Sequence, residues 1–270
     1  GAGWGIAGSA VGTVVAQWGM AIACAAIAWR HARREGASVR PGLPGVAAAA
    51  RAGGWMLLRT LTLRIALIAT VVSATGLGTV TLASTQVIFQ LTFLFALALD
   101  AFAIAAQAMI GFDLGAGTHE QVRATVRRLI AWGVASGVVL GGVLAGVAPW
   151  LGFVFSSDAG VAEAVPVGAW VVAATMPLGA LVFVLDGVLI GAADGRYLAL
   201  ARVVNLVVYL PLLWWASLTP ADAGAPAAVL AIQLAYCVGF YGIRALTLGV
   251  RAAGSRWMGG SQAAPATIVQ

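Results

Sequence analysis

Two acidic side chains lie deep inside apolar stretches of this sequence, and they are its first candidates for chemistry. Asp100 is the only charge in a run of more than thirty residues, 78–111. Asp186 lies in a second apolar run, with Pro177 nine residues before it and Gly187 directly after it. An ionisable side chain inside a membrane span is costly and by default marks a functional site. The two carboxylates therefore point to an ion or substrate pathway.

Three glutamines accompany Asp100 on the same predicted helix. Gln86, Asp100 and Gln107 are spaced by multiples of seven, and at about 100° per residue they lie within about 60° of one another, with Gln90 beside them. A helix that lines a wet cavity would present such a face. A polar seam that holds packed helices together is the alternative.

Two arginines lie inside the span that precedes Asp100. Arg59 is about one turn from the end of that span and could extend to the membrane surface, whereas Arg64 is deeper and needs a partner or water. Residue counts from the turn at 76–78 place Arg59 nearer the level of Asp100. We therefore predict that Asp100 pairs with Arg59 or, less favourably, with Arg64.

The second acid has an alternative, structural interpretation. Asp186 could lie near the cytoplasmic surface and bond Arg202 or Arg196, in which case it would hold helices together. Asn205, in the next span, is a weaker candidate for the pathway, because a lone asparagine in a span is more typical of a hydrogen bond between helices.

Composition identifies the elements that must position these side chains. The chain of 270 residues is 61% hydrophobic and only 9% charged, whereas a soluble domain is about 25% charged. The sequence therefore predicts an all-α integral membrane protein, a polytopic bundle of seven transmembrane helices. The predicted spans are about 4–29, 55–75, 78–111, 129–150, 164–193, 197–218 and 227–243.

The arginines predict the orientation of the bundle. Thirteen of the fifteen lie in alternate loops, at 30–54, 112–128, 194–202 and from 244 onward, and the opposite loops hold none. The positive-inside rule then places the C-terminus in the cytoplasm of a multi-pass cell-membrane protein. Because topology explains where the basic residues lie, the net charge of +6 does not indicate nucleic acid as a partner.

Enzyme and cofactor motifs are missing from the sequence. It contains no lysine, which excludes Schiff-base chemistry, and its two histidines lie in separate loops, which argues against a zinc site. Residues 115–117 lack the lysine and hydroxyl of a phosphate loop. We predict no catalytic residues, no metal and no cofactor.

Four stretches, in order, resemble the multidrug and toxic compound extrusion (MATE) transporters, and most closely their DinF-like branch. GWGIAGSAVGTVVAQ is similar to the start of the sixth helix of that family, and RAGGWMLLRTLTLRIALIATVVSATGLG is similar to its seventh helix. LALDAFAIAAQAMIGFDLGAG is similar to the end of the eighth helix and its following loop, and LDGVLIGAADGRYLALARV to the tenth helix running into the eleventh. The resemblance implies that residues 1–30 are the last helix of the first lobe and 31–54 a cytoplasmic inter-lobe loop. It implies that 55–250 are the six-helix second lobe and 251–270 a cytoplasmic, disordered tail.

The resemblance also implies a function. Such a protein would be an antiporter that exports drugs or other small amphipathic or cationic compounds in exchange for protons or sodium ions. Its partners would be the surrounding membrane lipid and an N-terminal lobe that is missing here. Asp186 looks like the match to a cavity acid on the tenth helix. A seventh-helix glutamate of the sodium-coupled branch has no match, since that region has Arg59, and this favours protons. A lipid or polysaccharide flippase, a seven-span receptor and a fragment without transport activity are the alternatives.

Overall fold

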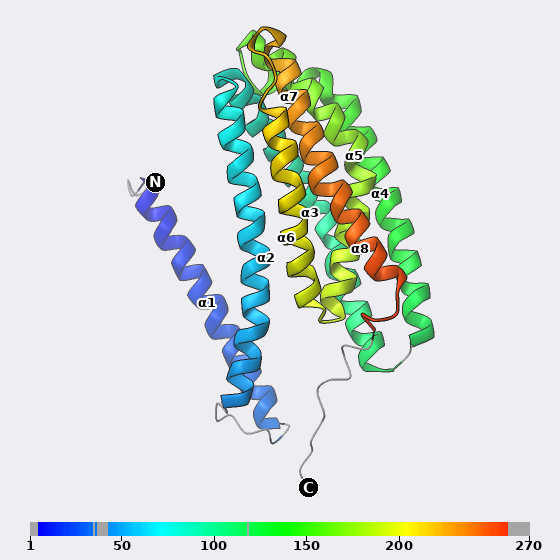
Figure 1. Ribbon diagram of the computed structural model, residues 1–270. Coiled ribbons are helices and arrows are strands. Elements are labelled where there is room, and N and C mark those ends of the chain that lie inside the picture. Colours follow the sequence, from blue (N-terminus) through cyan, green and yellow to red (C-terminus); the bar gives the residue numbers. More distant parts are fainter. Residues whose placement is uncertain (1–4, 35, 37–42, 118, 259–270) are drawn as a thin grey trace. The chain divides into compact units, whose positions relative to one another are not determined.

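In the computed structural model, which describes residues 5–34, 36, 43–117 and 119–258, every regular element is a helix. Seven helices in these ranges are long and apolar enough to cross a membrane, as predicted (Figure 1). The elements are α1 (Gly5–Arg34), α2 (Leu43–Gly76), α3 (Thr79–Gly115), α4 (His119–Phe155), α5 (Ala159–Gly191), α6 (Gly195–Ala216), η1 (Ala221–Ala223), α7 (Gly224–Ala235), η2 (Tyr236–Gly242) and α8 (Ile243–Ala253).

Several boundaries differ from the predicted ones. The expected loop at 31–54 is helical up to Arg34 and again from Leu43, so α2 begins twelve residues earlier than predicted. The last span is longer than 227–243, because α7, the π-helical segment η2 and α8 continue one another from Gly224 to Ala253. Apolar composition marks the membrane-spanning part of a helix, but the polar turns at its ends are helical too and carry no such signal.

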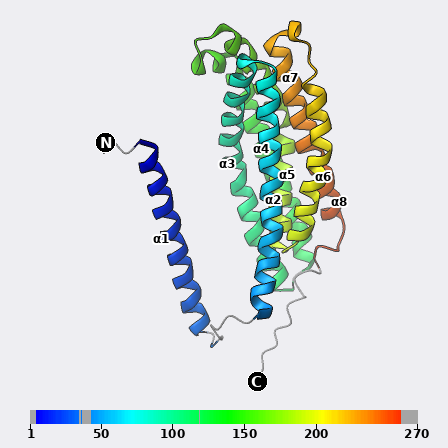
Figure 2. The same cartoon turned by 60° about the vertical axis from the view of Figure 1, so that its left-hand side comes forward.

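The chain divides into two compact units, residues 1–51 and 52–270. The first contains α1 and the start of α2. The second is a bundle in which α5 is the central helix, packed against α3, α4, α6, α7, η2 and α8 (Figures 1 and 2). More than half of the residues of α5 are buried, as expected for a helix that is apolar on all sides. Helix α5 remains helical through Pro177.

Close packing between α4 and α5 depends on small residues. Gly133, Gly137 and Gly141 recur every four residues along α4, and a Cβ at any of them would lie within 3 Å of an atom of α5. Interfaces of this kind allow membrane helices to approach closely, which is how such helices associate without a hydrophobic driving force. The same device holds α5 against α3, where Gly187 lies next to Ala103.

Helix α2 joins the bundle through α6. Ala66 of α2 is buried in a cluster with Tyr209 and Leu213 of α6. The hydroxyls of Thr70 and Tyr209 are 2.6 Å apart and form a hydrogen bond between the two helices. This contact fixes the height of α2 beside α6, and therefore the height at which Arg59 of α2 lies.

The beginning of the predicted disordered tail is ordered. Trp257 is only 2% exposed and packs into the same cluster as Leu198 and Leu248, and its indole Nε1 donates hydrogen bonds to the carbonyls of Ala252 and Gly254. Residues 251–258 are therefore part of the second unit, which corrects the prediction for them. Residues 259–270 lie outside the described residues.

Candidate functional site

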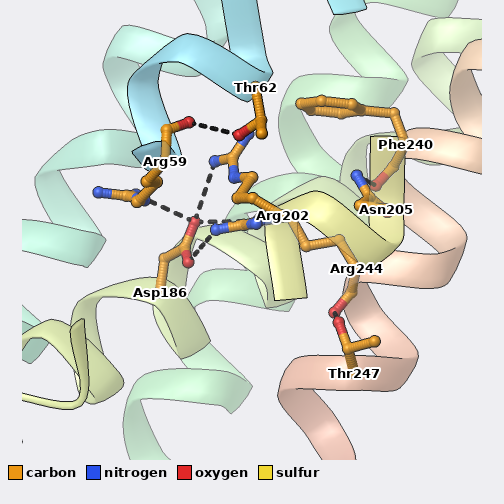
Figure 3. Close-up of polar contacts among 8 residues, drawn as sticks. All are labelled: Arg59, Thr62, Asp186, Arg202, Asn205, Phe240, Arg244 and Thr247. Carbon is orange, nitrogen blue, oxygen red and sulfur yellow. Dashed lines mark hydrogen bonds and ion pairs between the residues drawn. The ribbon is translucent and has the colours of Figure 1, made fainter. Parts of the chain in front are cut away.

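Asp186 is the centre of the most densely charged site in the described part of the chain. It lies on α5, and three arginines from three other helices converge on its carboxylate (Figure 3). Arg244 of α8 bonds both oxygens, Oδ2 through Nε at 3.2 Å and Oδ1 through a terminal nitrogen. Arg59 of α2 and Arg202 of α6 each place a terminal nitrogen near Oδ2, at 3.5 and 3.6 Å. One carboxylate therefore links α2, α5, α6 and α8.

The arginines outnumber the acid at this site. Three guanidiniums and one carboxylate leave a formal net charge of +2 among side chains that are largely withdrawn from solvent. The side chain of Arg244 is 1% exposed, those of Asp186 and Arg202 are each 10% exposed, and that of Arg59 is 24% exposed. We call these four residues the arginine cluster. Its more open side is the side of Arg59.

The π-helical segment η2 supports the arginine cluster from the side. The wider turn leaves the carbonyl of Phe240 to accept a hydrogen bond from Nδ2 of Asn205 at 3.1 Å (Figure 3). The guanidinium of Arg202 lies over the ring of Phe240, 5.2 Å from its centroid, a cation–π contact. Asn205 thus makes the hydrogen bond between helices that its sequence context favours, and it holds η2 in position beside Arg202.

The predicted pairing of Asp100 is wrong. Arg59 bonds Asp186 instead, and Arg64 is exposed. No ion pair of Asp100 occurs in the described ranges. Residue counts along two antiparallel helices give the heights of Arg59 and Asp100, but they do not give the direction in which each side chain points. Arg59 points into the bundle and Asp100 points out of it.

The four polar residues of α3 that were predicted to share a face, three glutamines and Asp100, do so. Gln86, Gln90, Asp100 and Gln107 are all exposed, whereas Ser84, Thr85, Ile88, Leu99, Ala103 and Ala106 of the same helix are buried in the lobe. We call the four exposed residues the α3 polar face. They do not form a seam within the bundle, which removes that alternative for the second unit. They are also separate from the arginine cluster, so seven of the eight predicted site residues fall into two groups, one on α3 and one at or beside the arginine cluster. The eighth, Arg64, is exposed on α2.

Sequence reasoning assigned Arg202 and Arg244 to cytoplasmic loops, and both are in fact buried in helices. Arg202 was foreseen as one of two partners for Asp186. The other, Arg196, is exposed and lies over the ring of Trp55 instead. Arg244 was missed. The other eleven arginines of the predicted cytoplasmic loops remain the basis for the predicted orientation.

The described ranges hold no group of three or more His, Cys, Asp or Glu side chains placed to bind an ion. Cys237 is buried and bonds Thr175 through its sulfur at 3.2 Å, as a small core residue does. The second unit thus holds an exposed carboxylate at Asp100 and an excess of positive charge around Asp186.

Two curated plant proteins share sequence with this chain. The chain is 31% identical over 148 residues to Protein DETOXIFICATION 43 of Arabidopsis thaliana, which is 55% of this chain and 28% of that protein. It is 27% identical over 167 residues to Protein DETOXIFICATION 42 of the same plant, 62% of this chain and 32% of that protein. The chain thus spans about a third of the length of the curated relatives it matches.

A solved structure shares the fold. It is a MOP superfamily transporter from Pyrococcus furiosus, described as having a binding pocket of reverse polarity that suggests a different function for that protein. It superposes with a TM-score of 0.64 at 19% identity, over 74% of this chain and 43% of that one. The MatE family model matches residues 56–215, more than half of the chain and most of the arginine cluster. The chain belongs to the MatE family.

Proposed function

We propose that the full protein is a secondary active exporter that moves small amphipathic or cationic compounds out of the cell in exchange for protons. In this proposal the chain supplies the C-terminal part of a transporter of the DinF-like branch, as the last helix of the first lobe and the six-helix second lobe. The C-terminus is cytoplasmic and the membrane is the cell membrane. The family match, the detoxification names of the relatives and the fraction of their length that is matched support this proposal.

The observation that carries the proposal is the contrast between the two intramembrane acids. Asp186 forms ion pairs with three arginines, so its carboxylate is already occupied by fixed cations. Asp100 is exposed on the α3 polar face, has Gln107 on the same face two turns away, and lies in a helix of membrane-spanning length. An exposed acid without a fixed cation can take up a proton, or bind a cationic substrate, and then release it.

Competition for Asp100 would couple the two movements. A proton and a cationic substrate that need the same carboxylate exclude one another, which is negative linkage between two ligands. Rocking of two lobes would expose the carboxylate to each side of the membrane in turn. Helix α2 carries Arg59 and Arg64 and no acid, so a second carboxylate for sodium is not available from that helix, and this favours protons as the coupling ion.

The test is Asp100→Asn in the full-length protein. A pH gradient would be imposed across inverted membrane vesicles. Fluorescence would then follow the accumulation of ethidium, a cationic dye, inside them. We expect a loss of at least tenfold in gradient-driven accumulation at equal protein abundance. The control is Asp222→Asn, the same chemical change at an exposed residue of η1. Undiminished accumulation in Asp100→Asn would disprove the role of this acid.

The arginines support a second candidate function, a flippase for lipids or polysaccharide precursors. Arg59 is partly exposed and Arg64 is exposed, and cationic side chains inside the membrane suit phosphate groups. Transfer of a fluorescent phosphatidylglycerol between leaflets of proteoliposomes, with ethidium transport absent, would favour the flippase over the exporter.

A further inference from the structure

The arginine cluster holds more positive charge than Asp186 can balance. One guanidinium that bonds both carboxylate oxygens, as Arg244 does, is sufficient to neutralise one acid. Arg59 and Arg202 add two further charges in a membrane-spanning bundle, where each uncompensated charge is costly. A purely structural ion pair does not explain two extra arginines.

The unused hydrogen-bond donors of the cluster indicate what the extra charge is for. Buried guanidinium nitrogens without any partner occur on all three arginines, namely Nε of Arg59, Nε and one terminal nitrogen of Arg202, and one terminal nitrogen of Arg244. A buried donor that is left unpaired costs free energy. Oxyanions such as carboxylate and phosphate carry several acceptor oxygens in one plane or tetrahedron, and guanidiniums match that geometry.

We propose that the arginine cluster is an oxyanion-binding site, which takes the carboxylate or phosphate group of the transported compound, and that Asp186 is its resident anion. The inference rests on the proposed export function only in naming the transported compound as the source of that group. The ligand enters on the side of Arg59, the most exposed arginine of the three, and competes with the Asp186 carboxylate for the same three guanidiniums.

Competition with a resident anion gives this site a signature that a structural ion pair lacks. Removal of the Asp186 charge frees the donors, so Asp186→Asn should bind an added oxyanion more tightly. Removal of an arginine charge takes donors away, so Arg202→Gln should bind it more weakly. A structural cluster would instead lose stability in both variants and respond to no added anion.

The experiment uses the full-length protein in phosphatidylcholine nanodiscs at neutral pH. Binding of succinate and of inorganic phosphate is measured by titration calorimetry and by the shift of the thermal unfolding midpoint. We expect saturable binding to the unaltered protein, about tenfold weaker in Arg202→Gln and about tenfold tighter in Asp186→Asn. The control is Arg196→Gln, which removes an exposed arginine of the same helix and should leave the affinity unchanged.

A parallel arm distinguishes a lipid from a free compound as the source of the oxyanion. Nanodiscs that contain phosphatidic acid should displace succinate if a lipid headgroup is the ligand, and should not if a free compound is. If Asp186→Asn does not fold, the affinities of Arg202→Gln and Arg59→Gln for succinate and phosphate test the proposal. Unaltered affinity in folded Arg202→Gln, weaker binding in Asp186→Asn, or no binding of any probe to the unaltered protein would overturn the proposal. Binding is measured without transport, so failed export in Asp100→Asn vesicles and failed oxyanion binding are separate results.

Discussion

The charge imbalance around Asp186 predicts that its three arginines contribute unequally to stability. Arg244 makes two hydrogen bonds to the carboxylate and is fully buried, whereas Arg59 and Arg202 each make one contact, at 3.5 and 3.6 Å. We therefore expect the change Arg244→Gln to destabilise the protein much more than Arg202→Gln or Arg59→Gln, and Asp186→Asn to destabilise it most.

The magnitudes follow from Coulomb's law with an effective dielectric constant of about 20. The attraction between Arg202 and the Asp186 oxygen at 3.6 Å is then roughly 5 kcal/mol. Arg59 and Arg244 contact the same oxygen at 3.5 and 3.2 Å, so each can be no farther than about 7 Å from the Arg202 nitrogen. Each then repels Arg202 by roughly 2 kcal/mol or more. Attraction and repulsion nearly cancel for Arg202.

This cancellation sets the expected changes in the free energy of unfolding. Arg202→Gln should cost less than about 1 kcal/mol, since it also removes the penalty for burying a charge. Arg244→Gln loses a two-point, charge-assisted bond and should cost about 2–3 kcal/mol. Asp186→Asn leaves three guanidiniums without an anion and should cost about 3–5 kcal/mol.

Chemical or thermal unfolding of the full-length protein in detergent micelles, followed by tryptophan fluorescence, measures this order. Arg196→Gln, on the exposed surface of α6, is the matched control for a change from arginine to glutamine. If Arg202→Gln proves as costly as Arg244→Gln, the three arginines form a balanced network. The cluster would then hold no excess charge for a ligand to balance, and the proposed oxyanion site would be refuted.

Two further predictions concern the packing that positions the cluster. Gly187→Ala would place a Cβ 2.2 Å from the backbone oxygen of Ala103, so it should destabilise the lobe by about 1–3 kcal/mol, whereas Gly142→Ala, with open space around it, should be neutral in the same unfolding assay. Trp257→Ala should reduce the free energy of unfolding by about 3–5 kcal/mol because the side chain is buried. Trp214→Ala, at a side chain that is 67% exposed, should cost far less. Equal effects of the two glycine variants, or of the two tryptophan variants, would show that the close contact or the buried tail is not part of the stable structure.

The number and approximate extent of the helices could be predicted from the sequence because membrane spans carry a strong compositional signal. The face shared by Gln86, Asp100 and Gln107 could be predicted for a similar reason, since helical periodicity alone fixes which residues lie together. Both predictions depend on one helix at a time. Neither requires knowledge of how two helices are turned relative to one another.

The partner of Arg59 could not be predicted in this way. A residue count from the turn between α2 and α3 gives the height of Arg59 along its helix, but the direction of its side chain depends on what α2 packs against. In the structure α2 packs on α6 through Ala66 and the bond between Thr70 and Tyr209. That contact turns Arg59 toward Asp186, and no local pattern in the sequence of α2 encodes it.

Arg244 could have been found from a length argument. The predicted last span, 227–243, would be only about 26 Å long at 1.5 Å per residue, which is short for a hydrocarbon core of about 30 Å. Extension of the span by a few residues includes Arg244 and makes it an intramembrane arginine. The π-helical turns of η2, which leave the Phe240 carbonyl for Asn205, have no comparable signal in the sequence.

The separation of the two polar regions has a consequence for the transport cycle that we propose. The α3 polar face is exposed on the lobe and holds an acid without a fixed cation, and the arginine cluster is buried and holds cations in excess. The first region lies outside the packed core of the lobe, whereas the second links α2, α5, α6 and α8 through one carboxylate. An anion that draws the guanidiniums away from Asp186 would loosen the contacts among these four helices. The buried cluster is therefore the region where binding would be linked to a change in helix packing.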